Sequence, residues 1–327
     1  MRGAITPVQA VCMAAMAMAV TGCSSTGVSD LSSYKPVPIP KADHIPSKEQ
    51  MRLGKSKVVV YEVQSATPGA KEYGLDAAMT SALEGKVAKA AELVDRSAAR
   101  ALRREVETAE RSGDASYSGP DVADYAVKAQ ISQANFGSSF QEARTTEDDD
   151  QIPAKCSYEA EVVGVMKIYT VPDLDVAKTI GLEGDAYSST ETRSSECNAA
   201  GQGLLRTAAE EAISSRRTAF QNFFAPRGYV VKRRKKEDDN LFKTTLGTDL
   251  AAKKGRSVQV IRVKEHRNEL TGAMEIHKRQ LAEGVITEEL GANYSWIRVS
   301  EPKKADKLKM GDRVKPVFEK GWLGLGG

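Results

Sequence analysis

The sequence predicts an α/β protein: an α+β sandwich with a mixed sheet, followed by a small all-β barrel of the SH3-like kind. Two patterns lead to this prediction. Between about residues 55 and 227, segments with a helical spacing of apolar residues alternate with strand-like segments. Beyond residue 228 only strand-like runs remain, separated by glycines and polar turns. A chain of 327 residues, 41% of them hydrophobic, is long enough for two such domains.

The first elements of the α/β half have simple signatures. The run "KSKVVVYEV" predicts a largely buried strand over residues 58–63. Apolar residues then recur at every fourth position, which predicts one face of a helix: Leu75, Met79, Leu83 and Val87. "AELVDR" predicts a second, short strand. The next helix is expected over residues 97–111, with Asp95 or Ser97 as its cap.

Two long alternating segments follow. Residues 125–131 and 156–170 each place apolar side chains on one side of a strand, and the polar stretch between them predicts an antiparallel hairpin with a long acidic loop. A third strand is expected over residues 178–190. A long helix from residue 204 to residue 223 should end before Pro226.

The last hundred residues contain several strand-like runs: "YVVKRR", "SVQVIRVKE", "GAMEIHKRQLAEGVITEEL", "SWIRVS" and "DRVKPVF". They predict the barrel, with a domain boundary between residues 227 and 228. His266 and His277 flank a turn and are expected on the surface. Trp296 is expected in the barrel core rather than on a ligand platform.

The N-terminus is typical of a secretory signal. Arg2 precedes an apolar run that ends near Val20, which is too short for a membrane-spanning helix. Val20-Thr21-Gly22-Cys23 matches the processing box of bacterial lipoproteins, so residues 1–22 are predicted to be a signal peptide and Cys23 a lipidated anchor. The alternative is an ordinary cleaved signal with a chance cysteine. Several acyl chains on Cys23 would hold the protein on a membrane without spanning it.

Residues 23–54 are rich in Ser, Pro and Lys, which predicts a flexible tether. Ser24 and Ser25, rather than an aspartate, follow the anchor. By resemblance to lipoprotein sorting, this favours the periplasmic face of the outer membrane. The tether either serves a distant partner or is a spacer with no partner.

Cysteine usage predicts one disulfide. Cys12 leaves with the signal and Cys23 is modified, so Cys156 and Cys197 remain, and an exported chain most simply pairs them. The alternative is two buried thiols in neighbouring strands. These residues and the scattered His44, His266 and His277 are too few for a metal site, so no metal and no cofactor are expected.

The segment "SALEGKVAKAAELVDRSAARALRREVETAE" carries a family resemblance. With "ADYAVKAQIS" and "YEAEVVGVMKIYTVPDLDVAKTIGLEG", it resembles the periplasmic domain shared by the curli-secretion (CsgG) lipoproteins, the penicillin-binding-protein activators (LpoB) and flagellar assembly protein T. The resemblance covers about residues 55–225, and Val94-Asp95-Arg96 is its most specific piece. "GTDLAAKKGRSVQVIRV" and "KLKMGDRVKPVF" resemble, more weakly, the C-terminal domain of flagellar assembly protein T.

The resemblance leaves the role of its motif open. Asp95 can accept backbone N–H groups at a helix start, and Arg96 can pair with Asp95 or Glu92. Alternatively, both residues hold a partner or an active site. The family's channel is not carried over, because "ISQANFGSSFQEARTTEDDDQIPAK" loses the apolar side that a lipid-facing strand needs.

Each of two runs of charged residues could either bind a ligand or be a solvated surface segment with no function. Glu147 to Asp150 would suit a basic partner or calcium, or would form a solvated loop tip, since its spacing matches no calcium loop. Lys232 to Lys236 would suit an anionic polymer, or would form a hairpin tip offset by the acids that follow. The net charge of +3 gives no indication of nucleic acid.

No catalytic motif is present: no Gly-x-Ser-x-Gly, phosphate loop, paired-histidine motif or Cys-His dyad. The expected function is therefore non-enzymatic. We expect an outer-membrane lipoprotein that binds periplasmic or outer-membrane proteins, with possible homo-oligomers, as a scaffold or ring of an envelope machine. The alternatives are activation of a peptidoglycan synthase and a curli-type secretion channel.

Overall fold

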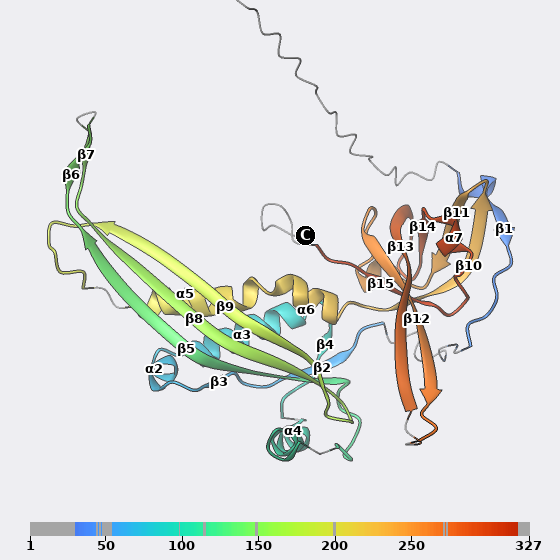
Figure 1. Ribbon diagram of the computed structural model, residues 1–327, viewed down its shortest axis with the longest axis horizontal. Coiled ribbons are helices and arrows are strands. Elements are labelled where there is room, and N and C mark those ends of the chain that lie inside the picture. Colours follow the sequence, from blue (N-terminus) through green and yellow to red (C-terminus); the bar gives the residue numbers. More distant parts are fainter. Residues whose placement is uncertain are drawn as a thin grey trace, which may run out of the picture.

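The computed structural model describes residues 30–43, 45, 47, 54–97, 99–113, 116–147, 150–198, 201–270, 272 and 274–319. The predicted signal peptide and Cys23 lie outside these residues. The protein is a mixed α/β structure in which a helix-covered sheet and a barrel lie toward opposite ends of the longest axis (Figure 1). Among the described residues, every helix is too short or too polar to cross a bilayer.

The first sheet has the strand order β4-β2-β5-β8-β9. The short strand β2 (Lys57–Val60) pairs in parallel with β4 (Glu92–Leu93) and with β5 (Tyr125–Gln141). Strand β3 (Gln64–Ser65) also pairs in parallel with β5. The long strands β5, β8 (Lys155–Thr170) and β9 (Val176–Glu191) are antiparallel. The predicted hairpin and the predicted third strand are therefore confirmed.

Helices cover both faces of this sheet. Helices α2 (Pro68–Glu72), α3 (Leu75–Val87), α5 (Gln202–Ser214) and α6 (Arg217–Phe223) lie on one face, and α4 (Arg100–Ser112) lies on the other (Figure 1). The alternation of β2 divides its side chains between the two layers: Val58 and Val60 pack beneath α3 and α5, whereas Val59 and Tyr61 pack against α4.

The bounds of α3 coincide with the predicted apolar repeat, but the predicted long helix is two helices. The chain breaks at Ser215 and Arg216 because both side chains bond to β9: the Ser215 hydroxyl donates to the Glu183 carbonyl at 3.2 Å, and Arg216 Nε donates to the Gly181 carbonyl at 2.9 Å.

The C-terminal half is a second sheet that closes on itself. Its order is β10 (Gly228–Lys236), β11 (Asp239–Thr244), β14 (Ser295–Val299), β13 (Met274–Leu290), β12 (Ser257–Arg267) and β15 (Arg313–Pro316). Strand β15 pairs again with β10, which completes the ring. Short helices η2 (Thr248–Leu250) and α7 (Pro302–Ala305) connect strands. Strand β11 was not predicted from the sequence. Strand β13 is a single strand of 17 residues.

The N-terminal segment differs from the predicted tether. Helix η1 (Leu31–Ser33) and strand β1 (Lys35–Val37) pack on the barrel, where β1 pairs with β10. Tyr34 is buried, and its hydroxyl donates to Asp239 at 2.5 Å. Pro36 does not prevent this pairing because β1 is an edge strand, where a missing N–H is tolerated. Residues 30–43 therefore form a strap on the barrel rather than a free spacer.

Beyond the helical layer, β5, β8 and β9 continue as a three-stranded ribbon. We call residues 136–159 and 187–198 the arm, and the part of these strands nearer the helices, 125–135, 160–170 and 176–186, the base. Strands β6 (Arg144–Thr145) and β7 (Gln151–Ile152) extend the hairpin to the tip of the arm (Figure 1). Most side chains of the arm are exposed.

Candidate functional site

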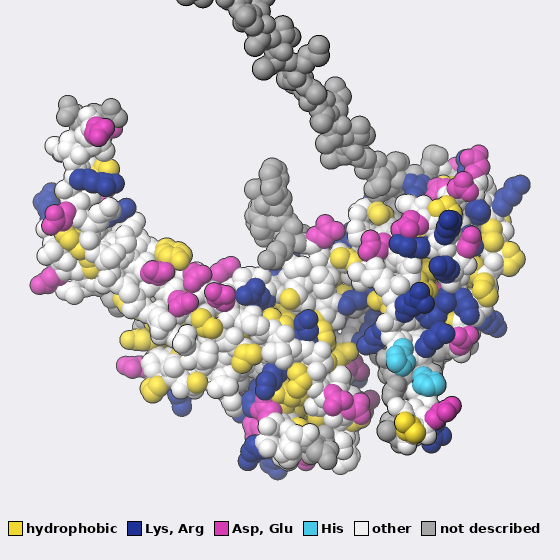
Figure 2. Space-filling view, in the orientation of Figure 1, with side chains coloured by type: hydrophobic (Ala, Val, Ile, Leu, Met, Phe, Trp, Pro, Cys, Tyr) yellow, Lys and Arg dark blue, Asp and Glu magenta, His cyan; other side chains and the backbone are white. Residues whose placement is uncertain are grey.

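The face of β8 and β9 that is opposite α5 carries a row of carboxylates. These side chains alternate with buried ones that face the helices, so they share the open face of the sheet. We call this set the acidic face: Glu159, Glu161, Glu183, Asp185 and the neighbouring Tyr187. Figure 2 shows acidic side chains gathered along the sheet where the arm begins. A sequence signal existed, because the acids occur two residues apart in both strands.

The register places like charges against each other on the acidic face. Glu161 lies directly opposite Asp185, and Glu159 lies opposite Tyr187. Carboxylates in such positions repel one another. Negative charge on Glu159, and then on Asp185, raises the pKa of Tyr187. Tyr187 is 69% exposed, so the acidic face presents a large aromatic side chain to solvent.

The predicted disulfide is present in the arm. Cys156 on β8 is bonded to Cys197, with a Cα–Cα distance of 5.5 Å. Cys156 lies opposite Thr190 of β9, and Cys197 belongs to the segment that returns from β9 toward α5. The bond therefore ties this returning segment to the middle strand of the arm.

The contacts of Val94, Asp95 and Arg96 hold the local backbone and the neighbouring elements in place. The backbone N–H of Val94 donates to the Val58 carbonyl at 2.9 Å, which adds the motif to the sheet edge. Asp95 accepts the backbone N–H of Ser97 at 2.6 Å. Arg96 pairs with Glu62 at 3.4 Å and with Glu84 at 3.3 Å, rather than with Asp95 or Glu92.

The expected helix cap is corrected by the structure. The residue preceding α4 is Ala99, with no side-chain cap, because the chain turns at Arg96, Ser97 and Ala99 before the helix begins at Arg100. Asp95 therefore stabilises this turn, and neither it nor Ser97 caps α4.

A groove of about 610 Å³ lies between the strap and the barrel. Its walls combine aromatic rings, cations and strap residues, including Tyr294, Trp296, Arg234, Lys243, Pro36 and Val37. Trp296 is buried outside the barrel core, against Tyr34 and Leu241. The expected place in the core is taken by Ile297 and Val299, because alternation along β14 turns Trp296 to the other face.

The predicted basic run is divided between structural and exposed roles. Arg233 is buried and pairs with Asp306 at 2.6 Å. The guanidinium of Arg234 lies 5.7 Å from the Trp296 ring and donates to the Leu31 carbonyl at 2.8 Å. Lys232 and Lys236 are exposed on either side of them. The run ends in the predicted hairpin turn between β10 and β11.

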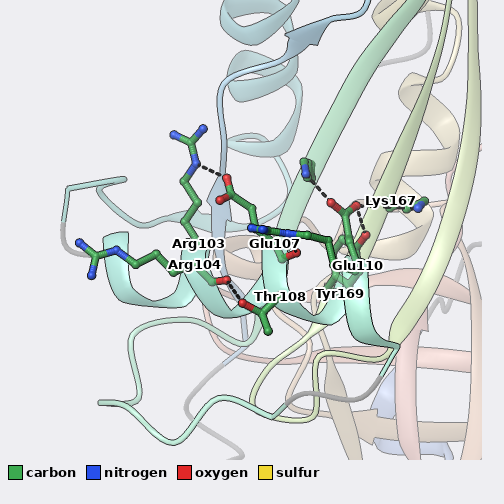
Figure 3. Close-up of polar contacts among 9 residues, drawn as sticks. Arg103, Arg104, Glu107, Thr108, Glu110, Lys167 and Tyr169 are labelled. Atoms are coloured by element: carbon green, nitrogen blue, oxygen red, sulfur yellow. Dashed lines mark hydrogen bonds and ion pairs between the residues drawn. The ribbon is translucent and has the colours of Figure 1, made fainter.

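Helix α4 is fastened to the sheet by Glu110 (Figure 3). Tyr169 donates its hydroxyl to Glu110 Oε1 at 2.6 Å, Lys128 pairs with Oε2, and Lys167 lies 3.8 Å from Oε1. Burial raises the pKa of Glu110, but the hydrogen bonds from Lys128 and Tyr169 outweigh it and hold the pKa below its usual value. The negative charge of Glu110 is thus balanced by the two lysines and stabilised by the hydrogen bond from Tyr169.

The remaining polar residues that the sequence singled out are exposed wherever the structure describes them. His266 and His277 are exposed, as predicted, with ring centroids 6.5 Å apart. Glu147 and Asp150 lie at the tip of the arm, and the other two acids of that run lie outside the described residues. Within the described part of the chain, no three His, Cys, Asp or Glu side chains gather as a metal site would require.

Comparison with known proteins gives little further guidance. No family model and no curated protein matches the chain. Among solved structures, the PelC dodecamer from Paraburkholderia phytofirmans is 14% identical, covers 57% of this chain and 97% of its own, and has a TM-score of 0.23. A second crystal form of that dodecamer is 12% identical, with coverages of 49% and 85% and a TM-score of 0.22.

The hypothetical protein CT253 from Chlamydia trachomatis is 14% identical over 51% of this chain and 98% of its own, with a TM-score of 0.23. Likeness at this level carries no argument about fold or function. The functional proposal therefore rests on the residues themselves.

Proposed function

We propose that this protein is an outer-membrane-anchored periplasmic lipoprotein that acts by binding, as a non-enzymatic scaffold or assembly component of a cell-envelope machine. The observation that carries the proposal is the arm, together with the acidic face, which begins on the base and continues into the arm. A ribbon of three strands projects beyond the helices with exposed side chains, and such a surface suits a binding partner better than it suits internal packing.

The acidic face supports a partner with basic surface charge. Glu161 and Asp185 face each other on neighbouring strands, and the repulsion between their carboxylates lowers the stability of the fold. A cationic partner surface would relieve this repulsion, and Tyr187 would supply an aromatic contact of the kind enriched at interfaces. A second copy of the chain and another envelope protein are both candidates for this partner.

The strap changes what a lipid anchor would do. Only six residues lie between Cys23 and Asp30, where the strap begins, so this stretch spans at most about 25 Å. An anchor at Cys23 would therefore hold the barrel close to the membrane. The arm lies at the opposite end of the longest axis (Figure 1), where it would reach toward periplasmic partners.

Two finer assignments belong to the same proposal. We assign the closed barrel to the SH3-like kind on the return of β15 to β10. We assign the α/β half to the superfamily of curli-secretion lipoproteins and penicillin-binding-protein activators on the Val94-Asp95-Arg96 segment and the strands that follow it.

The first experiment measures the mass of the chain from residue 24 onward by multi-angle light scattering across a range of concentrations. A discrete oligomer that Tyr187→Ser disrupts would support a scaffold built through the arm. Tyr73→Ser is the matched control, because Tyr73 is 38% exposed and lies outside the arm. A monomer would instead favour the activator, to be tested by adding a purified penicillin-binding protein and measuring glycan synthesis.

The second experiment tests the anchor with the full-length chain. Cells are fed an alkyne-labelled fatty acid, and the labelled protein is followed through membrane fractionation. Cys23→Ser should abolish the label and release the protein into the periplasm. Label retained in Cys23→Ser, or unlabelled protein in the soluble fraction without the substitution, would overturn the anchor.

A further inference from the structure

Four cationic side chains gather where the barrel meets the α/β half. Arg313 and Lys315 lie on β15, Lys278 lies on β13, and Arg227 lies between α6 and β10. We call them the cationic cluster. They are separated by up to 88 positions in the chain, so no run of basic residues reveals the cluster in the sequence.

Sheet geometry directs three of the four cations to one surface. Val314 and Pro316 are buried, so the alternating Arg313 and Lys315 point out of the barrel. On the neighbouring strand β12, Ile261 lies opposite Arg313 and Gln259 lies opposite Lys315. The same face of β12 carries Val263, which lies opposite Lys278 of β13.

The α/β half supplies the fourth cation. The Arg227 backbone N–H donates to the Gly54 carbonyl at 3.0 Å, and its Nη2 lies 3.2 Å from the Tyr125 hydroxyl and 3.5 Å from the Ser56 hydroxyl. These contacts hold the guanidinium beside the first strand of the other sheet. The cluster thus joins residues from both halves of the molecule.

The positive charges of the cluster act on one another. Burial first, and then repulsion from Arg227, Lys278 and Arg313, lowers the pKa of Lys315 to about 8. Burial and the neighbouring arginines also lower the pKa of Lys278. The pKa of Arg313 is lowered chiefly by burial and next by Arg227. The cluster thus holds several positive charges close together in a partly buried place, where the charged forms are less stable than they would be in water.

Two other arginines of this barrel have acidic partners, whereas no member of the cluster has one in the described structure. Arg262 pairs with Asp312 at 2.8 Å, and Arg233 pairs with Asp306 at 2.6 Å. Over the described ranges, no carboxylate forms an ion pair with any member of the cluster. In addition, Nε of Arg313 is buried without a hydrogen-bond acceptor. A donor in this position is costly unless an acceptor binds to it.

We propose that the cationic cluster binds a phosphate group, as a phosphomonoester or another phosphate that carries two negative charges. Two guanidinium forks and two ammonium groups offer donors from several directions, which suits a tetrahedral oxyanion with three or four acceptor oxygens. A carboxylate has two oxygens and one charge, and would leave most of the cluster unmatched. Lys278 is exposed as a residue although its ammonium group is partly desolvated, so at least one member of the cluster is open to solvent.

This inference is independent of the arm and of the partner proposed for the acidic face. The phosphate has two possible sources: a free phosphorylated small molecule, or the headgroup of a phosphorylated lipid. The shared chemistry is the dianionic phosphate, and the experiment separates the sources.

The test uses the chain from residue 24 onward, in isothermal titration calorimetry with inorganic phosphate at constant ionic strength. We expect phosphate to bind and acetate not to bind. Arg313→Gln/Lys315→Gln should weaken phosphate binding at least about tenfold, whereas Lys232→Gln/Lys236→Gln, which changes two exposed lysines of the same barrel, should leave it unchanged. Thermal unfolding without phosphate should show that the first variant is at least as stable as the parent, because it loses unmatched charge.

Vesicles then distinguish the two sources. Co-sedimentation with phosphatidic acid, abolished by free phosphate and absent with phosphatidylcholine, would identify the lipid headgroup. Phosphate binding without co-sedimentation would identify a small molecule. Equal response to acetate, or phosphate binding unaffected by Arg313→Gln/Lys315→Gln, would overturn the proposal. Self-association lost in that variant, with no phosphate binding, would overturn it in favour of carboxylates from a second copy.

Discussion

The same three strands exist in two environments, and the contrast between base and arm shows what holds each part. In the base, Ile131, Met166 and Leu182 are fully buried beneath helices. In the arm, the hydrogen-bonded ladder continues out to Gln141 opposite Lys155, but neither face is covered to the same extent. Backbone pairing is therefore common to both regions, and helix packing belongs to the base alone.

This difference predicts where stability resides. Burial of apolar surface is the main favourable term in folding, so substitutions in the base should affect the whole molecule. The arm depends on its ladder and on the disulfide, and its opening should cost less than global unfolding. Each prediction below measures one side of this contrast.

The largest effect is expected at Gly184, where α5 lies closest to the sheet. A Cβ at this position would overlap the carbonyl oxygen of Ala208 and the backbone nitrogen of Ala212. Gly184→Val should therefore force α5 away from β9 and lower the free energy of unfolding by more than about 4 kcal/mol, the range of severe packing defects. Denaturant unfolding measured by circular dichroism tests this.

Gly181 on the same strand is the matched control. A Cβ there meets no atom within 4 Å, so Gly181→Val should leave the free energy of unfolding within about 0.5 kcal/mol of the parent. Equal destabilisation by both substitutions would mean that strand propensity, rather than the approach of α5, explains the result.

A second pair of variants compares burial along β9 directly. Leu182 is 1% exposed in the base and Tyr187 is 69% exposed in the arm. Leu182→Ala should cost about 3 to 4 kcal/mol, whereas Tyr187→Ala should cost less than about 0.5 kcal/mol. Chemical denaturation of both variants is the measurement, and similar losses would contradict the division into base and arm.

The disulfide should separate the two regions more clearly. Cys156 and Cys197 are 41 positions apart, and losing their bond should lower global stability by about 3 kcal/mol. In Cys156→Ser/Cys197→Ser, hydrogen exchange should become faster in the arm before it changes in the base. The reduced parent protein is the control and should behave like the variant. Uniform acceleration in both regions would show that the arm has no separate opening.

Local sequence patterns were sufficient to predict those elements that are identified by the apolar residues on one face. The four apolar positions of α3 and the alternation of β8 depend on neighbours within a few residues, so both elements could be predicted. The disulfide followed from counting the cysteines that remain after Cys12 and Cys23 are set aside.

Features that depend on distant partners could not be predicted. The prolines of the strap indicate extended backbone, but only its pairing with β10 shows that Pro36 occupies an edge strand. Trp296 is apolar in either environment, and only the strap explains why it is buried outside the core. The acidic face needed the register between β8 and β9, because the residues of each strand alone do not show which acids face each other.

The smallest expected effect concerns Glu110, which joins α4 to the base. The charged groups that face it are Lys128 and Lys167, and the neutral hydroxyl of Tyr169 donates a hydrogen bond to it. Because the hydrogen bonds lower its pKa in the folded protein, Glu110 contributes stability that is fully present above the pKa of the unfolded chain and is lost as the pH falls through the lowered pKa. Glu110→Gln should therefore cost about 1 kcal/mol at pH 7.

The pH dependence distinguishes this ion-pair effect from a packing defect. The stability difference between Glu110→Gln and the parent should be constant from pH 7 to pH 5 and should shrink on further acidification. Glu105→Gln on the same helix is the control, because in the described structure Glu105 makes none of the contacts that Glu110 makes with Lys128, Lys167 and Tyr169. A difference that persists unchanged at low pH would mean that α4 is held by its apolar face, and that the carboxylate adds nothing to the attachment.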